Sequence, residues 1–83
     1  MSAYTVFLTN TQGDLLFAHL SVPAPTPEQA YQTTVQLYFP NHQAQTISTR
    51  HYAGHGVSAY TFALDGETHY NASVEEELEG EAV

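Results

Sequence analysis

Histidine is the residue of this chain best suited to chemistry, because its ring nitrogens bind metal ions and exchange protons near neutral pH. The chain has five histidines, which are His19, His42, His51, His55 and His69. His51 and His55 lie four residues apart, a spacing found in zinc sites. The glycines around His55 favour a turn over a helix face, however, and the chain has no cysteine. A third ligand, His69, would join only if its strand neighboured that of His51. We therefore interpret the histidines as ordinary polar residues.

Serines and carboxylates are the other candidates for catalysis. A nucleophilic serine needs a base and an orienting acid, and the chain has neither a Gly-x-Ser-x-Gly sequence nor a phosphate-binding glycine loop. The acids before residue 75 are Asp14, Glu28, Asp65 and Glu67. None of them lies in an apolar run that would raise its pKa. The sequence predicts a protein without catalytic residues, metal or cofactor, and a histidine-dependent metal enzyme is kept as an alternative.

Charge limits the partners of this chain more than any motif does. Nine acidic residues stand against one basic residue, Arg50, and there is no lysine. Nucleic-acid binding requires Lys and Arg to replace the counterions of phosphates, so we expect none. Binding to anionic membranes is disfavoured for the same reason. Attraction to a basic protein surface is allowed.

The acidic residues are concentrated at the end of the chain. Five of the nine fall in its last nine residues, and they are Glu75, Glu76, Glu77, Glu79 and Glu81. Ser73-Val-Glu-Glu76 matches a capping box that could begin a helix, whereas acidic runs are often disordered. We expect a domain over residues 1–74 and an acidic tail over 75–83, either disordered or a short helix. The tail either keeps the protein in solution or docks on a basic groove.

Residues 26–40 contain the clearest helix signals. Thr26 is suited to the N-cap, with Pro27 at the first helical position, and Pro40 ends the helix. One apolar stripe runs along it, formed by Ala30, Tyr31, Thr34, Val35, Leu37 and Tyr38. A single stripe requires a single partner surface, most simply a sheet.

Alternating apolar residues predict strands over 4–9, 15–22, 45–52, 57–64 and 67–71. Ile47 is the clearest core residue of the third strand. Asp65-Gly66 is a strong signal for a hairpin between the last two strands. The fold class is therefore α+β, with a single antiparallel sheet, one helix packed on one face and the order β-β-α-β-β-β.

Aromatic residues are expected on the sheet face that the helix leaves open. Phe7 and Phe17 alternate with the main apolar residues of their strands, which places them on this second face. Asp14, in the turn between the two strands, adds an acidic edge. Aromatic side chains are common in the centres of interfaces. We therefore predict that Phe7, Phe17, Asp14 and the acids of the tail bind a partner.

The chain is short, at 83 residues, and forms one domain near the lower limit for a single core. It has no recognisable signal peptide, so a cytoplasmic location is expected. It is similar in size and charge, though in no motif, to phage-encoded inhibitors such as anti-CRISPR proteins. The similarity implies an inhibitor that occupies a basic, nucleic-acid-binding surface of a larger protein or ribonucleoprotein complex. The alternative is a structural subunit that self-associates, for example as a homodimer, through its open sheet face.

Overall fold

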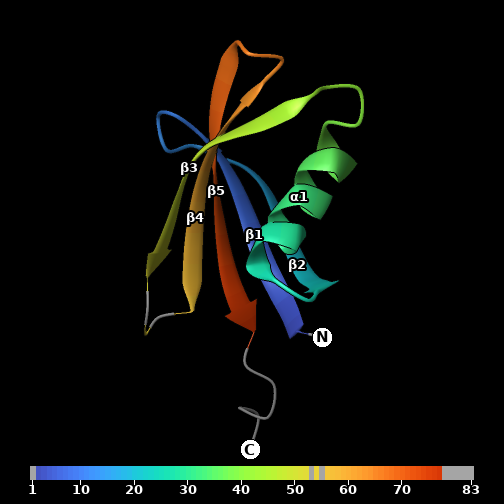
Figure 1. Cartoon of the computed structure of the whole chain (residues 1–83), viewed down its shortest axis with the longest axis vertical. Coiled ribbons are helices and arrows are strands. Elements are labelled where there is room, and N and C mark those ends of the chain that lie inside the picture. Colours follow the sequence, from blue (N-terminus) through green and yellow to red (C-terminus); the bar gives the residue numbers. More distant parts are fainter. Residues whose placement is uncertain (1, 53, 55, 78–83) are drawn as a thin grey trace, which may run out of the picture.

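Five antiparallel strands and one helix make up the part of the chain that the computed structural model describes, residues 2–52, 54 and 56–77. Their bounds are Ser2–Asn10 (β1), Leu15–Ala24 (β2), Pro27–Tyr38 (α1), Ala44–Tyr52 (β3), Val57–Leu64 (β4) and Thr68–Glu77 (β5). The strands form one sheet in the order β2-β1-β5-β4-β3, and α1 packs on one face of it (Figure 1). The predicted α+β fold and its element order are confirmed.

The first and last strands lie beside each other at the centre of the sheet. β5 pairs with β1 from Asn10↔Tyr70 to Ala3↔Glu77, well beyond the predicted end of this strand at residue 71. Its buried residues Ala72 and Val74 continue the alternation that places every second side chain against the core. The expectation of a tail or short helix is therefore wrong for residues 75–77, which are strand. Glu79 and Glu81 lie outside the described residues.

Helix α1 begins and ends as its sequence signals predict. The Thr26 side chain caps it by accepting a hydrogen bond from the backbone N–H of Gln29 at 3.2 Å. Ala30, Tyr31, Thr34 and Val35 are buried, and Tyr38 is partly buried. The Tyr31 ring stacks on Tyr60 of β4 with a centroid distance of 4.4 Å. Leu37 does not belong to the buried stripe: it is 58% exposed, because it lies on the flank of the helix away from the sheet.

Two irregularities in β2 change which side chains face the helix. Leu16 is an extra residue between the pairs Leu8↔Phe17 and Thr9↔Leu15, and Leu20 and Ser21 together oppose a single residue of β1. Each extra residue inverts the alternation of the strand. The predicted apolar face of Leu16, Ala18 and Leu20 is consequently exposed, and only its last member, Val22, is buried.

Phe17 lies on the inner face as a result of these bulges, so its predicted outer position is wrong. Its ring stacks on Tyr38 of α1 at a centroid distance of 4.0 Å. Phe7 does lie on the outer face, where it pairs with Ala18 and Ser73.

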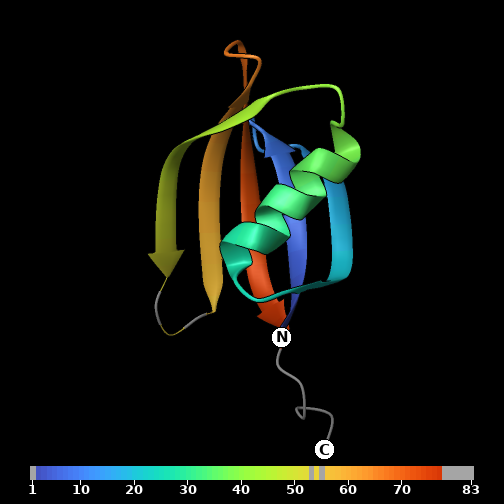
Figure 2. The same cartoon turned by 45° about the vertical axis from the view of Figure 1, so that its right-hand side comes forward.

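Strand β3 extends beyond the part of the sheet that α1 covers (Figure 2). All nine of its residues are exposed. Ile47 is a bulge residue between Thr46 and Ser48 and is 53% exposed, so its predicted core position is wrong. A hydrogen bond of 2.8 Å between the hydroxyls of Tyr31 and Thr46 connects α1 to β3.

Val35→Asp tests the packing of α1. Val35 is 4% exposed, and a carboxylate there would be buried without a partner. We expect the free energy of unfolding to fall by about 4 kcal/mol or more, enough to unfold a domain of this size. Leu37→Asp is the matched control on the exposed flank and should remain folded. Thermal denaturation followed by circular dichroism distinguishes the two, and a folded Val35→Asp protein would contradict the observed packing.

Candidate partner-binding surface

The face of the sheet opposite α1, here called the outer face, is covered by no element of the described chain. One row across it pairs Thr9, Asn71, Thr61 and Ser48 on neighbouring strands. The Thr61 hydroxyl donates a hydrogen bond to Asn71 Oδ1 at 2.9 Å. The next row runs through Phe7, Ser73, Ala59 and Arg50. The centre of the outer face is therefore formed by small, mostly uncharged side chains.

A shallow hollow of about 380 Å³ lies in this face. It is lined by side chains from four strands, including Thr9, Ser48, Arg50, Asn71 and Ser73. Small side chains leave the backbone of the sheet close to the surface, so another protein can approach it closely. Among the described residues, no carboxylate lines the hollow, and Arg50 is the single cation there.

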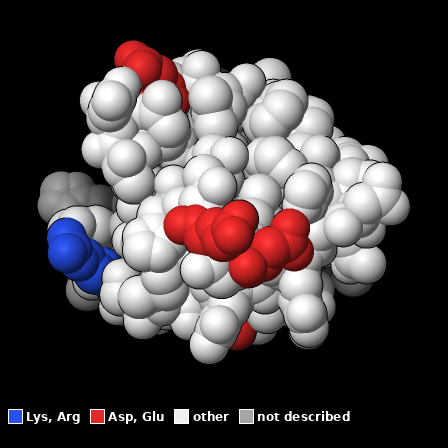
Figure 3. All heavy atoms as spheres, turned by 90° about the horizontal axis from the view of Figure 1, so that it is seen from above, with Lys and Arg blue, Asp and Glu red and all other residues white. Residues whose placement is uncertain are grey.

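The acidic residues lie at the two ends of the sheet and not at its centre. Asp14 follows β1 in the β1–β2 turn, and Asp65 and Glu67 lie in the β4–β5 turn at the same end. Figure 3 looks onto this end and shows acidic groups in more than one place. Arg50, the one basic residue of the sequence, belongs to β3. Glu75 and Glu77 lie at the opposite end of β5. The structure thus does not bring the predicted site residues that it describes together: Asp14 is separated from Glu75, Glu76 and Glu77 by the length of β1.

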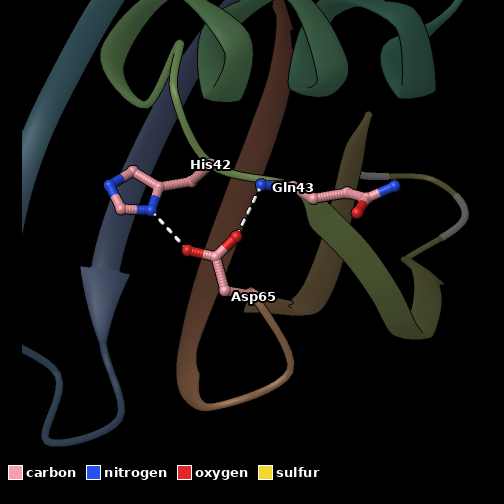
Figure 4. Close-up of polar contacts among 3 residues, drawn as sticks. All are labelled: His42, Gln43 and Asp65. Atoms are coloured by element: carbon pink, nitrogen blue, oxygen red, sulfur yellow. Dashed lines mark hydrogen bonds and ion pairs between the residues drawn. The ribbon is translucent and has the colours of Figure 1, made fainter.

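Asp65 joins the β4–β5 turn to the α1–β3 loop (Figure 4). Its Oδ2 lies 2.5 Å from Nδ1 of His42, and its Oδ1 accepts a hydrogen bond from the backbone N–H of Gln43 at 2.9 Å. Its own N–H donates to the Gln43 carbonyl at 2.8 Å. The bond from the Gln43 backbone, followed by the bond to His42, lowers the pKa of Asp65. The Asp65-Gly66 pair predicted the turn, but no pattern in the sequence indicated these contacts between Asp65 and the α1–β3 loop.

Glu77 has a comparable role at the other end of the sheet. Its carboxylate accepts hydrogen bonds from the Thr5 hydroxyl and from the Ser21 backbone N–H, both at 2.8 Å. Ser21 is the bulge residue of β2 and has a positive φ of 57°, which is uncommon for a residue other than glycine. The Thr5 bond, followed by the Ser21 backbone bond, lowers the pKa of Glu77. Glu77 therefore stabilises the bulge, while Glu75 and Glu76 are exposed.

His51 and His69, the two described members of the predicted histidine group, do not come together as the metal-site alternative would require. β4 lies between β3 and β5, so His51 and His69 are not on neighbouring strands. His51 Nδ1 lies 2.9 Å from the Ser58 hydroxyl instead. His55 falls outside the described residues. Within the described ranges, no three of His, Asp and Glu form a group that could hold a metal ion.

A second hollow, here called the α1–β3 pocket, was not predicted from the sequence. It measures about 330 Å³ and has an apolar floor that includes Tyr31, Val35 and Phe39. Its rim is polar and consists of Gln32, Gln36, His42, Gln43 and Thr46. The pocket lies between the second half of α1, the loop that follows it and the first residues of β3. It depends on how the helix and the strand pack together, which no local pattern in the sequence indicates.

Comparison with known proteins gives no match: no protein-family model, no curated protein and no solved structure is similar to this chain. The one helix of residues 2–52, 54 and 56–77 is too short to cross a membrane.

Glu77→Gln tests the carboxylate that holds the β2 bulge. Hydrogen bonds to the ionised form lower the folded-state pKa below the ordinary value of 4.5. Their contribution to stability is therefore complete above this value and is lost as the pH falls through the folded-state pKa. We expect the variant to unfold at lower urea concentration than the wild type at pH 7, with the difference shrinking in acid. Glu75→Gln, on an exposed neighbour, should leave the urea midpoint at pH 7 unchanged. Equal midpoints for wild type and Glu77→Gln would contradict the role of Glu77.

Proposed function

We propose that this chain is a non-catalytic binding protein that acts in the cytoplasm by covering a basic surface of a larger protein or ribonucleoprotein complex. The basic surface is one that otherwise binds nucleic acid, so its occupation inhibits the complex. One observation carries the proposal: the outer face is uncovered and almost neutral at its centre, and both of its ends are acidic.

The acidic ends and the centre of the outer face have different roles in this mode of binding. Exposed carboxylates such as Glu67 and Glu75 attract a basic surface over a distance and accelerate association. The small side chains around Ala59 and Thr61 then allow close contact, with Phe7 contributing apolar area. A typical interface buries about 800 Å² on each partner, a modest share of the 5423 Å² of accessible surface here.

The distribution of charge argues against mimicry of DNA along the fold. A mimic would place carboxylates in a regular array like that of phosphates, whereas the two rows at the centre of the outer face carry hydroxyl, amide and methyl groups, the Phe7 ring and the Arg50 guanidinium. Asp65 and Glu77 are also unsuited to imitating phosphates, because their carboxylates hold the α1–β3 loop and the β2 bulge. We infer that acidic edges steer the partner and that the neutral centre forms the contact.

Charge reversal at the exposed acids tests this proposal without disturbing the two structural carboxylates. The test variant combines Asp14→Lys, Glu67→Lys, Glu75→Lys and Glu76→Lys, and the control is Glu28→Lys on the exposed side of α1. Tagged wild-type protein should recover a basic nucleic-acid-binding partner from lysate of the source cell at low salt and lose it at high salt. The control should behave in the same way, and the test variant should recover little of this partner.

Purified partner then gives the decisive measurement. Wild type should displace nucleic acid from it in a competition assay, and the variant with four lysines should do so at least about tenfold less effectively, a loss of about 1.4 kcal/mol in binding free energy. Equal competition by both proteins would show that the acids only maintain solubility. Recovery of nothing but the chain itself at either salt concentration would contradict the proposal.

A further inference from the structure

Arg50 is the only lysine or arginine of the chain. It lies in β3, in the row that continues through Ala59 and Ser73, and it lines the hollow in the outer face. Within the described part of the chain the one ion pair joins His42 to Asp65, so the Arg50 guanidinium has no carboxylate partner there. The single cation of an acidic protein therefore stands unpaired in the surface that we propose as the contact area.

Other polar groups of the same hollow are also able to donate hydrogen bonds. Asn71 Oδ1 already accepts the hydrogen bond from the Thr61 hydroxyl, which leaves the NH2 group of the Asn71 amide for a ligand. Ser48 and Ser73 line the hollow as well, and a serine hydroxyl can donate as well as accept. The hollow thus combines hydrogen-bond donors with a positive charge, which favours a ligand that accepts hydrogen bonds and is negatively charged.

A carboxylate fits this hollow better than a phosphate group does. The guanidinium is a planar fork that binds two oxygens of either group side by side. A phosphate group carries about −1.5 to −2 charges, whereas the hollow holds one cation in a chain of net charge −8. The acidic ends of the sheet would repel the charge that Arg50 leaves unbalanced. A single carboxylate leaves none, because its charge equals that of Arg50.

Binding of a basic partner makes an opposing carboxylate necessary at this point. A partner that covers the hollow removes water from the guanidinium, and a charge buried without an opposite charge is strongly destabilising. A surface made only of lysine and arginine would add repulsion between like charges. A partner with one carboxylate among its basic residues avoids both effects. The outer face, negative at both ends and positive in the hollow, therefore favours a partner with the inverse pattern.

We propose that the hollow in the outer face binds one aspartate or glutamate side chain of the basic partner, with the carboxylate held by the Arg50 guanidinium and the Asn71 amide. This contact fixes how the two proteins are aligned. It also gives specificity, because Arg50 repels basic surfaces that lack a carboxylate at the matching position. The inference rests on the proposed function, since the partner supplies the acidic residue.

Competition with nucleic acid for the purified partner tests the use of Arg50. Arg50→Gln should displace nucleic acid at least about tenfold less effectively than wild type, because the carboxylate of the partner would then face an uncharged amide. Arg50→Lys keeps the charge but loses the planar fork, and it should fall between the two. The matched control is Thr49→Gln, at an exposed position on the opposite face of β3, which should equal wild type.

Poly-L-lysine, a basic chain without carboxylates, separates specificity from a general loss of binding. It should bind Arg50→Gln at least as tightly as wild type, because the substitution removes a repulsive charge. If Arg50→Gln loses binding to poly-L-lysine as strongly as it loses the partner, the role of Arg50 in selecting a carboxylate is refuted.

Acetate tests the hollow in the absence of a partner. At constant ionic strength it should cause saturable NMR shifts of the Arg50 side chain and the Asn71 amide, with a dissociation constant on the order of 10 mM. Neither acetamide with wild type nor acetate with Arg50→Gln should cause them. Shifts that do not saturate, or that persist in Arg50→Gln, would overturn the carboxylate site.

The two experiments separate this inference from the proposed function. Equal displacement of nucleic acid by wild type and Arg50→Gln would overturn the inference and leave the proposed function in place. A wild-type chain that binds acetate as expected but displaces no nucleic acid would contradict the proposed function, and with it the basic partner, while confirming that the hollow binds a carboxylate.

Discussion

The pairing of β1 with β5 is the contact on which the rest of the structure depends. It joins the β1–β2 hairpin to the three strands β3, β4 and β5, because β2 is attached only to β1 and β3 only through β4. It also brings the inward residues Val6, Leu8, Ala72 and Val74 together under the helix, all at or below 1% exposure. Without this pairing the core under α1 would be divided, since α1 packs on β1 and β2 on one side of it and on β5 on the other.

The near-absence of positive charge determines how the carboxylates are stabilised. In the absence of lysine, Asp65 is held by the backbone N–H of Gln43 and by His42, and Glu77 by the Thr5 hydroxyl and the backbone N–H of Ser21. Hydrogen bonds to the ionised form are an effective substitute for an opposite charge. The consequence is that the two carboxylates stabilise an irregular loop and a bulge.

Local signals in the sequence were sufficient for most of the elements. The caps of α1 and the Asp65-Gly66 turn are set by residues within four positions of each other, and both were predicted correctly. The sheet face on which each β2 side chain lies was not predicted correctly, because alternation cannot reveal a bulge. The bulge at Ser21 depends on a carboxylate 56 residues away. Ile47 was misplaced because the extent of helix cover over β3 is a tertiary property.

The candidate surface was harder to predict than the fold. The residues 75–77 resemble a tail by composition, and only pairing with β1 shows that they are strand. Phe7 was placed correctly on the outer face, whereas Phe17 was inverted by the bulges of β2. The distribution of acids at both ends follows from the strand order, which no local motif specifies.

The central position of β5 also has a consequence for how the chain folds during synthesis. Its partners β1 and β4 are synthesised earlier. The edge of each that pairs with β5 stays unpaired until residues 68–77 have been made. The contacts between β1 and β5 span about seventy residues of sequence, and such long-range pairing slows folding. During this interval the inner apolar face is open to solvent. The three consecutive glutamates at the end of β5 are the last residues of the sheet to be synthesised. Their negative charge disfavours association with other chains at the stage when the sheet is being completed.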